Sequence, residues 1–287
     1  MAPQTIALTD ETAGTLTLDA DVTVRRLGFG AMRITGEGIW GPPQDRAGAI
    51  ATLRRAVELG INLIDTADAY GPNVSEDLIA DALHPYPQDL VIATKGGLTR
   101  SGPGRWERDG RPEHLREACD GSLRRLRVDR IDLYQLHAPD PDIPFEESVG
   151  TLKELRDEGK IWLVGLSNVS VAQLEQARSI VPVVTVQNRF NLEDRDSEDV
   201  LKRCEELGMG FVPWRPISGG APDEERLREI GARHGATAAQ IALAWLLARS
   251  AMMLPIPGTS TVEHLEENVA AAGIELSGDE IAELSGP

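Results

Sequence analysis

Residues 61–70 read INLIDTADAY, a short apolar run that ends on a carboxylate. The first four residues suit a buried strand, which then finishes at Asp65. Tyr70 follows five residues later, and the Gly71-Pro72 pair interrupts the chain. An amphipathic pattern begins near Ser75. This stretch therefore predicts a strand, a short loop that carries an acid and a phenol, and then a helix.

The same alternation of short apolar runs and amphipathic runs repeats along the chain. The runs predicted as strands are Leu27–Gly30, Ile61–Asp65, Leu90–Thr94, Ile131–Leu136, Ile161–Leu166, Val183–Gln187, Gly210–Trp214 and Met252–Ile256. The helices that alternate with them are predicted to begin near Arg46, Ser75, Pro112, Pro144, Ser170, Ser197, Asp223 and Thr261. Eight strands that alternate with helices indicate an α/β fold, the (β/α)8 or TIM barrel.

Further elements are expected at the two ends of this pattern. Thr15–Leu18 and Val22–Arg25 predict an N-terminal β-hairpin, and Thr237–Arg249 and Ser277–Leu284 predict extra helices near the C-terminus. Because no linker rich in proline, glycine or serine divides the chain, residues 1–287 are expected to form a single barrel domain.

Composition narrows the function classes. Apolar residues make up 41% of the 287 residues, which indicates a globular protein with a large core. The net charge of −17 argues against a nucleic-acid partner. Two cysteines do not make a disulfide framework. The start lacks a signal-peptide pattern, and no run of about 18 apolar residues occurs. We therefore expect a cytoplasmic protein that does not bind membranes, either a monomer or a weak homo-oligomer.

The ends of the predicted strands carry a set of reactive side chains. The carboxyl ends of barrel strands face the active site, and the second, third and fourth strands lead to Asp65, Lys95 and His137. Each alone has a structural explanation, such as a cap or a satisfied core histidine. Together with Tyr70 they indicate a catalytic site. The polar stretch Gly96–Arg111 is predicted to be a long loop that covers this site.

These four side chains suit carbonyl reduction. When hydride reaches a carbonyl carbon, the oxygen becomes an alkoxide that needs a proton. Tyr70 can supply it, and a nearby Lys95 ammonium would lower the phenol pKa from its usual value of about 10. Asp65 would pair with the buried Lys95, and His137 would orient the substrate oxygen. Asp65 would thus hold Lys95 in place, and Lys95 would lower the pKa of Tyr70.

A cofactor must supply the hydride, because no side chain can do so. Ser167, Asn168 and Gln187 could hold a carboxamide, and Trp214 offers a face on which a nicotinamide ring could stack. Gln187 could instead be a satisfied polar residue at the rim. The loop at 257–260 precedes a helix start and could bind phosphate, and a plain capping turn is the alternative interpretation.

Three other chemistries lack their motifs. Gly28-Phe29-Gly30 is not followed by a third glycine at the spacing that a doubly wound dinucleotide fold requires. The five histidines do not have metal-ligand spacing, so no metal is expected. The Gly-x-Ser-x-Gly elbow of α/β-hydrolases is absent from the sequence.

Several stretches resemble the aldo-keto reductase family across nearly the whole chain. They are LGFGAM, NLIDTADAYGPNVSEDLIADAL, VIATKGG, LYQLHAPDP, GKIWLVGLSNVS, VQNRFNL and PIPGTSTVEHLEENVAA. The resemblance implies a catalytic tetrad at Asp65, Tyr70, Lys95 and His137. It also implies cofactor contacts from Gly30, Ala31, Met32, Asp65, Ser167, Asn168, Gln187, Trp214, Arg215, Pro216, Ile217, Gly258, Thr259, Ser260, His264, Glu267 and Asn268. The implied substrate contacts are Trp40, Tyr70, Trp106 and His137.

The chain departs from the family pattern in places. Trp214 stands where tyrosine is commoner, and Gly258 and His264 stand where many members place a lysine or arginine that grips the 2′-phosphate of NADP. NADP(H) remains the expected cofactor, and these departures argue less strongly against NAD(H) than the pattern of most family members does. The long C-terminal loop of some members is expected to be absent, which would leave the site more open on that side. The stretch GAMRITGEGIWGPPQDR resembles a bacterial subgroup that includes pyridoxal reductases, in which residues 38–43 would cap the pocket.

The expected activity is therefore NADP-dependent reduction of an aldehyde or ketone to an alcohol. A second hypothesis is a cofactor-binding redox sensor or auxiliary subunit on the same fold, with little turnover. A third, a barrel hydrolase that uses Asp65 and Asp68, leaves Lys95 and the loop around Thr259 unexplained. Consumption of NADPH with a reactive aldehyde would separate the first hypothesis from the second.

Overall fold

Seven parallel strands form the centre of the computed structural model, which describes residues 7–217 and 224–286. They form one sheet in the order β11-β10-β9-β8-β5-β4-β3. Their bounds are β3 (Phe29–Gly30), β4 (Leu63–Asp65), β5 (Val91–Gly96), β8 (Ile131–Leu136), β9 (Ile161–Ser167), β10 (Thr185–Gln187) and β11 (Gly210–Phe211). These agree with the predicted strands, although β11 ends early because Pro213 has no N–H to continue the ladder.

The eighth predicted strand, Met252–Ile256, is an extended segment without regular strand pairing. The backbone N–H of Phe211 donates to Met252 O at 2.9 Å, and that of Gly28 donates to Pro255 O at 2.9 Å. The segment thus lies between β11 and β3 and closes the sheet into a barrel. Pro255 and Pro257 lack N–H groups, which is why the prediction of a regular strand was wrong here.

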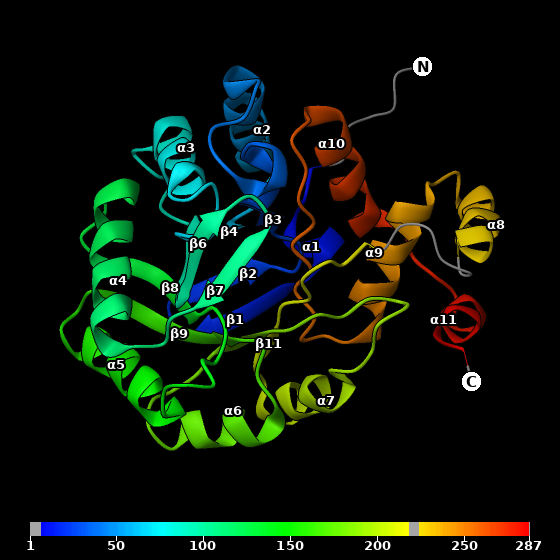
Figure 1. The fold of residues 1–287 in the computed structure, drawn as a ribbon. Coiled ribbons are helices and arrows are strands. Elements are labelled where there is room, and N and C mark those ends of the chain that lie inside the picture. The colour runs from blue at the N-terminus through cyan, green and yellow to red at the C-terminus, as the bar shows by residue number, and fades with distance from the viewer. Residues whose placement is uncertain (1–6, 218–223, 287) are drawn as a thin grey trace.

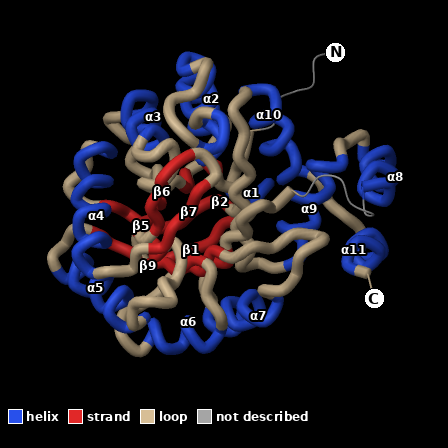
Figure 2. Tube along the Cα trace, in the orientation of Figure 1, coloured by secondary structure: helices blue, strands red, loops and turns tan. Residues whose placement is uncertain are grey.

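Helices surround the strands, as Figures 1 and 2 show. Those that alternate with the barrel strands are α2 (Arg46–Glu58), α3 (Val74–Leu83), α4 (Pro112–Leu126), α5 (Phe145–Asp157), α6 (Val171–Arg178), α7 (Glu198–Leu207), α8 (Glu224–His234) and α10 (Val262–Ala270). The extra helices are α1 (Asp10–Ala13), α9 (Ala238–Arg249) and α11 (Gly278–Ser285). The sequence predicted all of these except the short α1. Capping boxes at Ser170, Thr237 and Ser277 explain where α6, α9 and α11 begin.

The expected N-terminal hairpin closes one end of the barrel. It consists of β1 (Thr15–Asp19) and β2 (Val22–Arg25), which pair antiparallel. Its buried side chains, such as Leu16 and Val24, pack in one cluster with interior residues of the barrel such as Leu133 and Leu163. Since this end is filled with apolar side chains, the opposite end, where the strands finish, is left for a site.

The segment expected as a long irregular loop is instead a second hairpin. It consists of β6 (Leu98–Gly102) and β7 (Arg105–Arg108), which pair antiparallel. The turn between them contains Gly104 at a φ of +68°, a conformation that glycine adopts without strain. The loop after β3 also has local order, as two short 3-10 helices, η1 (Ala31–Ile34) and η2 (Glu37–Ile39). A third, η3 (Ala271–Gly273), follows α10.

Candidate active site

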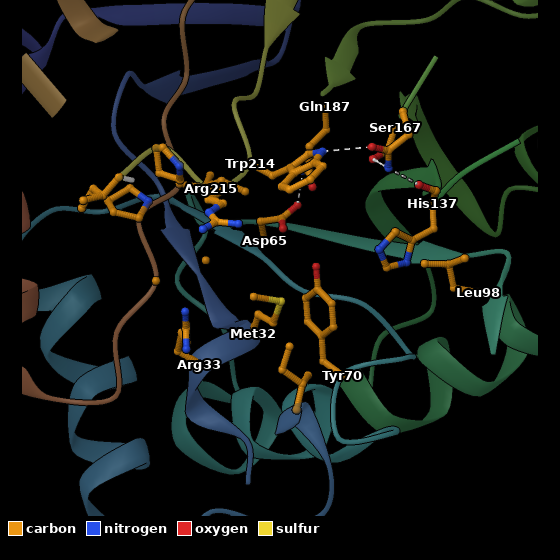
Figure 3. Close-up of a pocket in the computed structure, with 18 of the residues that line it drawn as sticks. Met32, Arg33, Asp65, Tyr70, Leu98, His137, Ser167, Gln187, Trp214 and Arg215 are labelled. Carbon is orange, nitrogen blue, oxygen red and sulfur yellow. Dashed lines mark hydrogen bonds between the residues drawn. The ribbon is translucent and has the colours of Figure 1, made fainter. Parts of the chain in front are cut away.

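A cavity of about 790 Å³ opens where the barrel strands end (Figure 3). Most of the residues predicted to form the site line it: Gly30, Met32, Asp65, Tyr70, Trp106, His137, Ser167, Asn168, Gln187, Trp214, Arg215, Pro216, Ile217 and Gly258. Ile39, Leu98 and Pro257 also line it, and they belong to segments that were expected to cap the pocket, to cover the site and to bind phosphate. Two further lining residues, Arg33 and Ile256, were not predicted.

Lys95 lies directly behind the cavity wall and is fully buried. Its Nζ donates to Asp65 Oδ2 at 2.6 Å, to the Thr66 carbonyl at 2.8 Å and to Tyr70 OH at 3.5 Å. An ammonium has three N–H donors, so these contacts use all of them. One buried cation therefore contacts both the carboxylate and the phenol.

The second oxygen of Asp65 is held by two amides. Its Oδ1 accepts from Gln187 Nε2 at 2.8 Å and from Gln135 Nε2 at 3.1 Å. Gln135 was not predicted to belong to the site. It could have been found, because strand residues alternate in direction and Gln135 shares the barrel-facing side of β8 with Leu133. Since its carboxylate is fully hydrogen-bonded, Asp65 is fixed in one orientation next to Lys95.

The pKa of Tyr70 is raised above its usual range, contrary to the expected lowering. Burial of the phenol raises it, and the nearby Lys95 lowers it by less. For Lys95, burial alone lowers the pKa, but the neighbouring Asp65 carboxylate and Tyr70 raise it, and the net shift is upward. At neutral pH, the site therefore holds a protonated phenol beside a charged ammonium.

His137 faces Tyr70 across the cavity, with ring centroids 5.9 Å apart and planes at 81°. Burial, and then the charge of Lys95, hold its pKa well below the usual value. The imidazole is therefore neutral at pH 7 and can donate one hydrogen bond. Its Nδ1 has no hydrogen-bond partner among the residues that the structure describes.

A chain of hydrogen bonds links the residues expected to hold a carboxamide. Asn168 Nδ2 donates to Ser167 Oγ at 2.9 Å and to the His137 carbonyl at 3.0 Å. Trp214 Nε1 donates to Asn168 Oδ1 at 3.0 Å, so the indole ring is fixed at the cavity wall. A tryptophan at this position thus gains a partner for its N–H while its face stays available for stacking.

The other end of the cavity carries cations and closely packed backbone. Arg33 and Arg215 line it, and Figure 3 shows them together on the side opposite His137. A Cβ added at Gly258 would lie 2.6 Å from Gly30 O, so only glycine permits this approach of the two loops. An elongated ligand with an anionic group at this end fits such a cavity.

Some predicted residues lie outside the cavity wall. Ala31, Thr259, Ser260, His264, Glu267 and Asn268 do not line it, although Gly258 beside them does. Thr259 Oγ1 accepts from Thr261 N at 3.2 Å, and Thr261 caps α10, so the turn has the capping contacts of the alternative interpretation. Ser260 and His264 are exposed next to this helix start. Trp40 also lies outside, although Ile39 before it is a lining residue.

Comparison with known proteins assigns the family. The model of the aldo/keto reductase family matches residues 26–286. The chain belongs to the aldo/keto reductase family. It is similar to an uncharacterized oxidoreductase of Schizosaccharomyces pombe, with 50% identity over 95% of this chain and 89% of the relative. It is also similar to pyridoxine 4-dehydrogenase of Escherichia coli, with 41% identity over 92% of this chain and 95% of the relative.

Solved aldo/keto reductases share the barrel. One from Klebsiella pneumoniae, in complex with NADP and acetate, superposes with a TM-score of 0.78 at 28% identity, over 94% of this chain and 93% of the other. The family assignment and this likeness confirm the predicted barrel and oxidoreductase class. Among residues 7–217 and 224–286, no helix has the length and apolar character needed to cross a membrane. The same residues contain no cluster of three acidic, histidine or cysteine side chains arranged for a metal ion.

Proposed function

We propose that this protein uses NADPH to reduce an aldehyde or ketone, with Tyr70 as the proton donor. The observation that carries the proposal is the contact of one buried ammonium, Lys95 Nζ, with both Asp65 Oδ2 at 2.6 Å and Tyr70 OH at 3.5 Å. Tyr70 lines the cavity and His137 faces it. A substrate oxygen between the phenol and the imidazole would receive two hydrogen bonds.

The raised pKa of Tyr70 suits this role. An acid must hold its proton before the reaction, and burial keeps the phenol protonated at neutral pH. Once the proton has left, the phenolate lies beside the Lys95 ammonium, which stabilises it. A bound nicotinamide supplies the hydride, and the residues of this chain supply the proton and the orientation.

The shape and charge of the cavity support a dinucleotide cofactor. Trp214 offers an indole face near Tyr70, and Ser167 and Asn168 place polar atoms beside it. Arg33 and Arg215 provide positive charge at the other end, where a diphosphate would lie. Ser260 and His264 are exposed at the start of α10, where they could reach a 2′-phosphate, which favours NADPH over NADH.

The aromatic walls of the cavity favour a flat aromatic aldehyde of the pyridoxal type. Tyr70, His137 and Trp106 contact one another edge to face, with ring centroids 5.9 to 6.3 Å apart. Planar rings bind well between such faces. The relative from Escherichia coli is named for a dehydrogenase of pyridoxine, the alcohol of this type.

A panel of carbonyl compounds with NADPH oxidation as the readout tests the proposal. Pyridoxal and benzaldehyde should be reduced, and NADPH should give a lower KM than NADH. Tight binding of NADPH without turnover on any aldehyde or ketone of the panel would instead favour the sensor hypothesis and overturn the proposal.

A further inference from the structure

Arg100 on strand β6 has a set of contacts that the proposed chemistry does not use. A guanidinium has five N–H donors in a rigid plane, and all five of this one meet backbone carbonyls. Nε donates to Arg105 O at 2.9 Å. One terminal nitrogen donates to Ile39 O at 2.9 Å and Ala69 O at 3.1 Å. The other donates to Gly38 O at 3.0 Å and Gly102 O at 3.4 Å.

These carbonyls come from three separate loops around the cavity. Gly38 and Ile39 belong to the loop after β3, Ala69 to the loop after β4, and the remaining two to the β6–β7 hairpin. The first two loops lie between 31 and 62 residues from Arg100 in sequence, whereas the hairpin is its own. One side chain therefore joins three segments that contribute residues to the wall of the cavity: Ile39, Tyr70, and Leu98 with Trp106.

The guanidinium also lies against two indoles. Its central carbon is 3.7 Å from the ring centroid of Trp106 and 5.8 Å from that of Trp40. Both distances are within the range of cation–π attraction, and the shorter one places the guanidinium in direct contact with Trp106. Trp106 is 37% exposed, so its indole ring depends on the contact with Arg100 to keep its orientation.

Arg100 has no carboxylate within ion-pair distance among the described residues, and burial lowers its pKa. An arginine that served only solubility would direct its charge into water. This one is partly buried, lies against the indoles of Trp106 and Trp40, and donates only to neutral carbonyls. Its bonds therefore organise the loops rather than neutralise a charge.

We propose that Arg100 is a positioning residue that holds Trp106 as a wall of the substrate pocket and so sets selectivity for planar aromatic carbonyls. The inference rests on the proposed reduction at Tyr70. Trp106 meets Tyr70 and His137 edge to face, each at 6.3 Å between ring centroids, so its plane defines one side of the space next to the phenol. An aromatic substrate needs this side, whereas a small aliphatic aldehyde does not.

The catalytic phenol itself has other anchors. Tyr70 N donates to Ala67 O at 3.1 Å, Ser75 N donates to Tyr70 O at 3.1 Å, and Lys95 contacts its hydroxyl. Loss of Arg100 therefore leaves the proton donor in place. The expected effect is on the binding of substrates, not on the chemical step.

The test compares Arg100→Ala with the matched variant Arg108→Ala. Arg108 lies on the same hairpin, is exposed, and makes no side-chain hydrogen bond or ion pair among the described residues. Arg100→Ala should raise KM for benzaldehyde by about tenfold or more, because a displaced Trp106 ring would no longer align the aromatic substrate. Its kcat with propanal and its Kd for NADPH should stay within about threefold of the wild type. Arg108→Ala should match the wild type throughout.

The variant Arg100→Lys distinguishes the effect of the positive charge from that of the planar set of five N–H donors. Lysine keeps the cation but cannot donate to carbonyls on three loops, so KM for benzaldehyde should rise as in Arg100→Ala. A wild-type KM for benzaldehyde in either Arg100 variant would overturn the inference. So would an equal loss of kcat with benzaldehyde and propanal.

A second readout does not depend on activity. Hydrogen exchange of the backbone amides at 36–41 and 97–109 should be faster in Arg100→Ala than in Arg108→Ala. If the wild type reduces no carbonyl, the proposed function fails. The difference in hydrogen exchange still tests whether Arg100 holds these loops together. Unchanged exchange at both segments would contradict the role of Arg100 whatever the activity.

Discussion

Lys95 Nζ lies 2.6 Å from Asp65 Oδ2, and both side chains are buried at the ends of adjacent parallel strands. Burying two charges is costly unless they are paired and hydrogen-bonded. Here Asp65 accepts from three side chains, and Lys95 donates to three acceptors. The pair therefore holds the Lys95 ammonium in a fixed position next to the phenol of Tyr70.

Removing one member of this pair should destabilise the fold. Asp65→Asn leaves the Lys95 ammonium buried without a counter-charge, which costs about 3–5 kcal/mol. Urea unfolding should show this loss of free energy. The control is Asp157→Asn, which breaks the exposed pair with Lys153 and should cost less than about 1 kcal/mol. Equal losses in the two variants would contradict a buried, fully paired site.

The barrel, and the meeting of Asp65, Tyr70, Lys95 and His137 at one end of it, could be predicted from the sequence because both follow from local patterns. Asp65, Lys95 and His137 each end a strand, and the parallel strands of a barrel bring such ends together. The hairpin with Arg100 and Trp106 could not be predicted in the same way. The stretch is rich in polar residues and glycine, and its order comes from contacts with loops far away in sequence, such as that of Arg100 with Ala69.

The same limit applies to pKa values. The sequence indicated correctly that Lys95 lowers the pKa of Tyr70, but not that burial raises it by more. Burial depends on the whole barrel, so no motif reports it. Arg33 was not predicted for a similar reason, since it is an exposed residue of a loop and lies beside Gly258 at the cavity wall only in the folded barrel.

The pH dependence of reduction follows from the two pKa shifts. The pKa of Tyr70 is raised by burial, and that of His137 is held low by burial and Lys95. The active form has a protonated phenol and a neutral imidazole. As pH rises through the pKa of Tyr70, the donor proton is lost and kcat falls. Steady-state kinetics should show a kcat that is flat from about pH 7 to 9 and falls above this range. A fall already complete at pH 8 would be inconsistent with a raised pKa.

Arg33 and His264 should act on different parts of the cofactor. Arg33→Ala removes a cation from the cavity wall, where the diphosphate common to both cofactors would lie, so KM should rise about tenfold for NADPH and NADH alike. His264→Ala should raise KM for NADPH alone, because only NADPH has a 2′-phosphate. Arg124→Ala on α4 controls for the change in net charge. A loss confined to NADPH in Arg33→Ala would reassign this residue to the 2′-phosphate.

Asp68 should make stability depend on pH. Burial, and then the charge of Glu76, raise its pKa to about 8, and its Oδ1 has no hydrogen-bond partner among the described residues. The folded state therefore keeps a proton that the unfolded chain releases near pH 4. Its contribution to stability is complete below that pH and is lost as pH rises to about 8. The other charged groups that act on it are Arg125 and Lys95.

Asp68→Asn should imitate the protonated carboxyl. The difference in Tm between this variant and the wild type should grow from pH 5 to about 8 in favour of the variant and then level off. Thermal unfolding at a series of pH values measures it. A difference that does not change with pH would show that Asp68 is not buried as a neutral acid.

The most direct test of the central claim is single-turnover reduction of an aldehyde by Tyr70→Phe loaded with NADPH. The variant keeps the ring and loses only the hydroxyl that contacts Lys95. It should bind NADPH as the wild type does and reduce the aldehyde more slowly by about two to four orders of magnitude, the usual contribution of a positioned proton donor. A single-turnover rate equal to that of the wild type would contradict the assignment of Tyr70 as the proton donor.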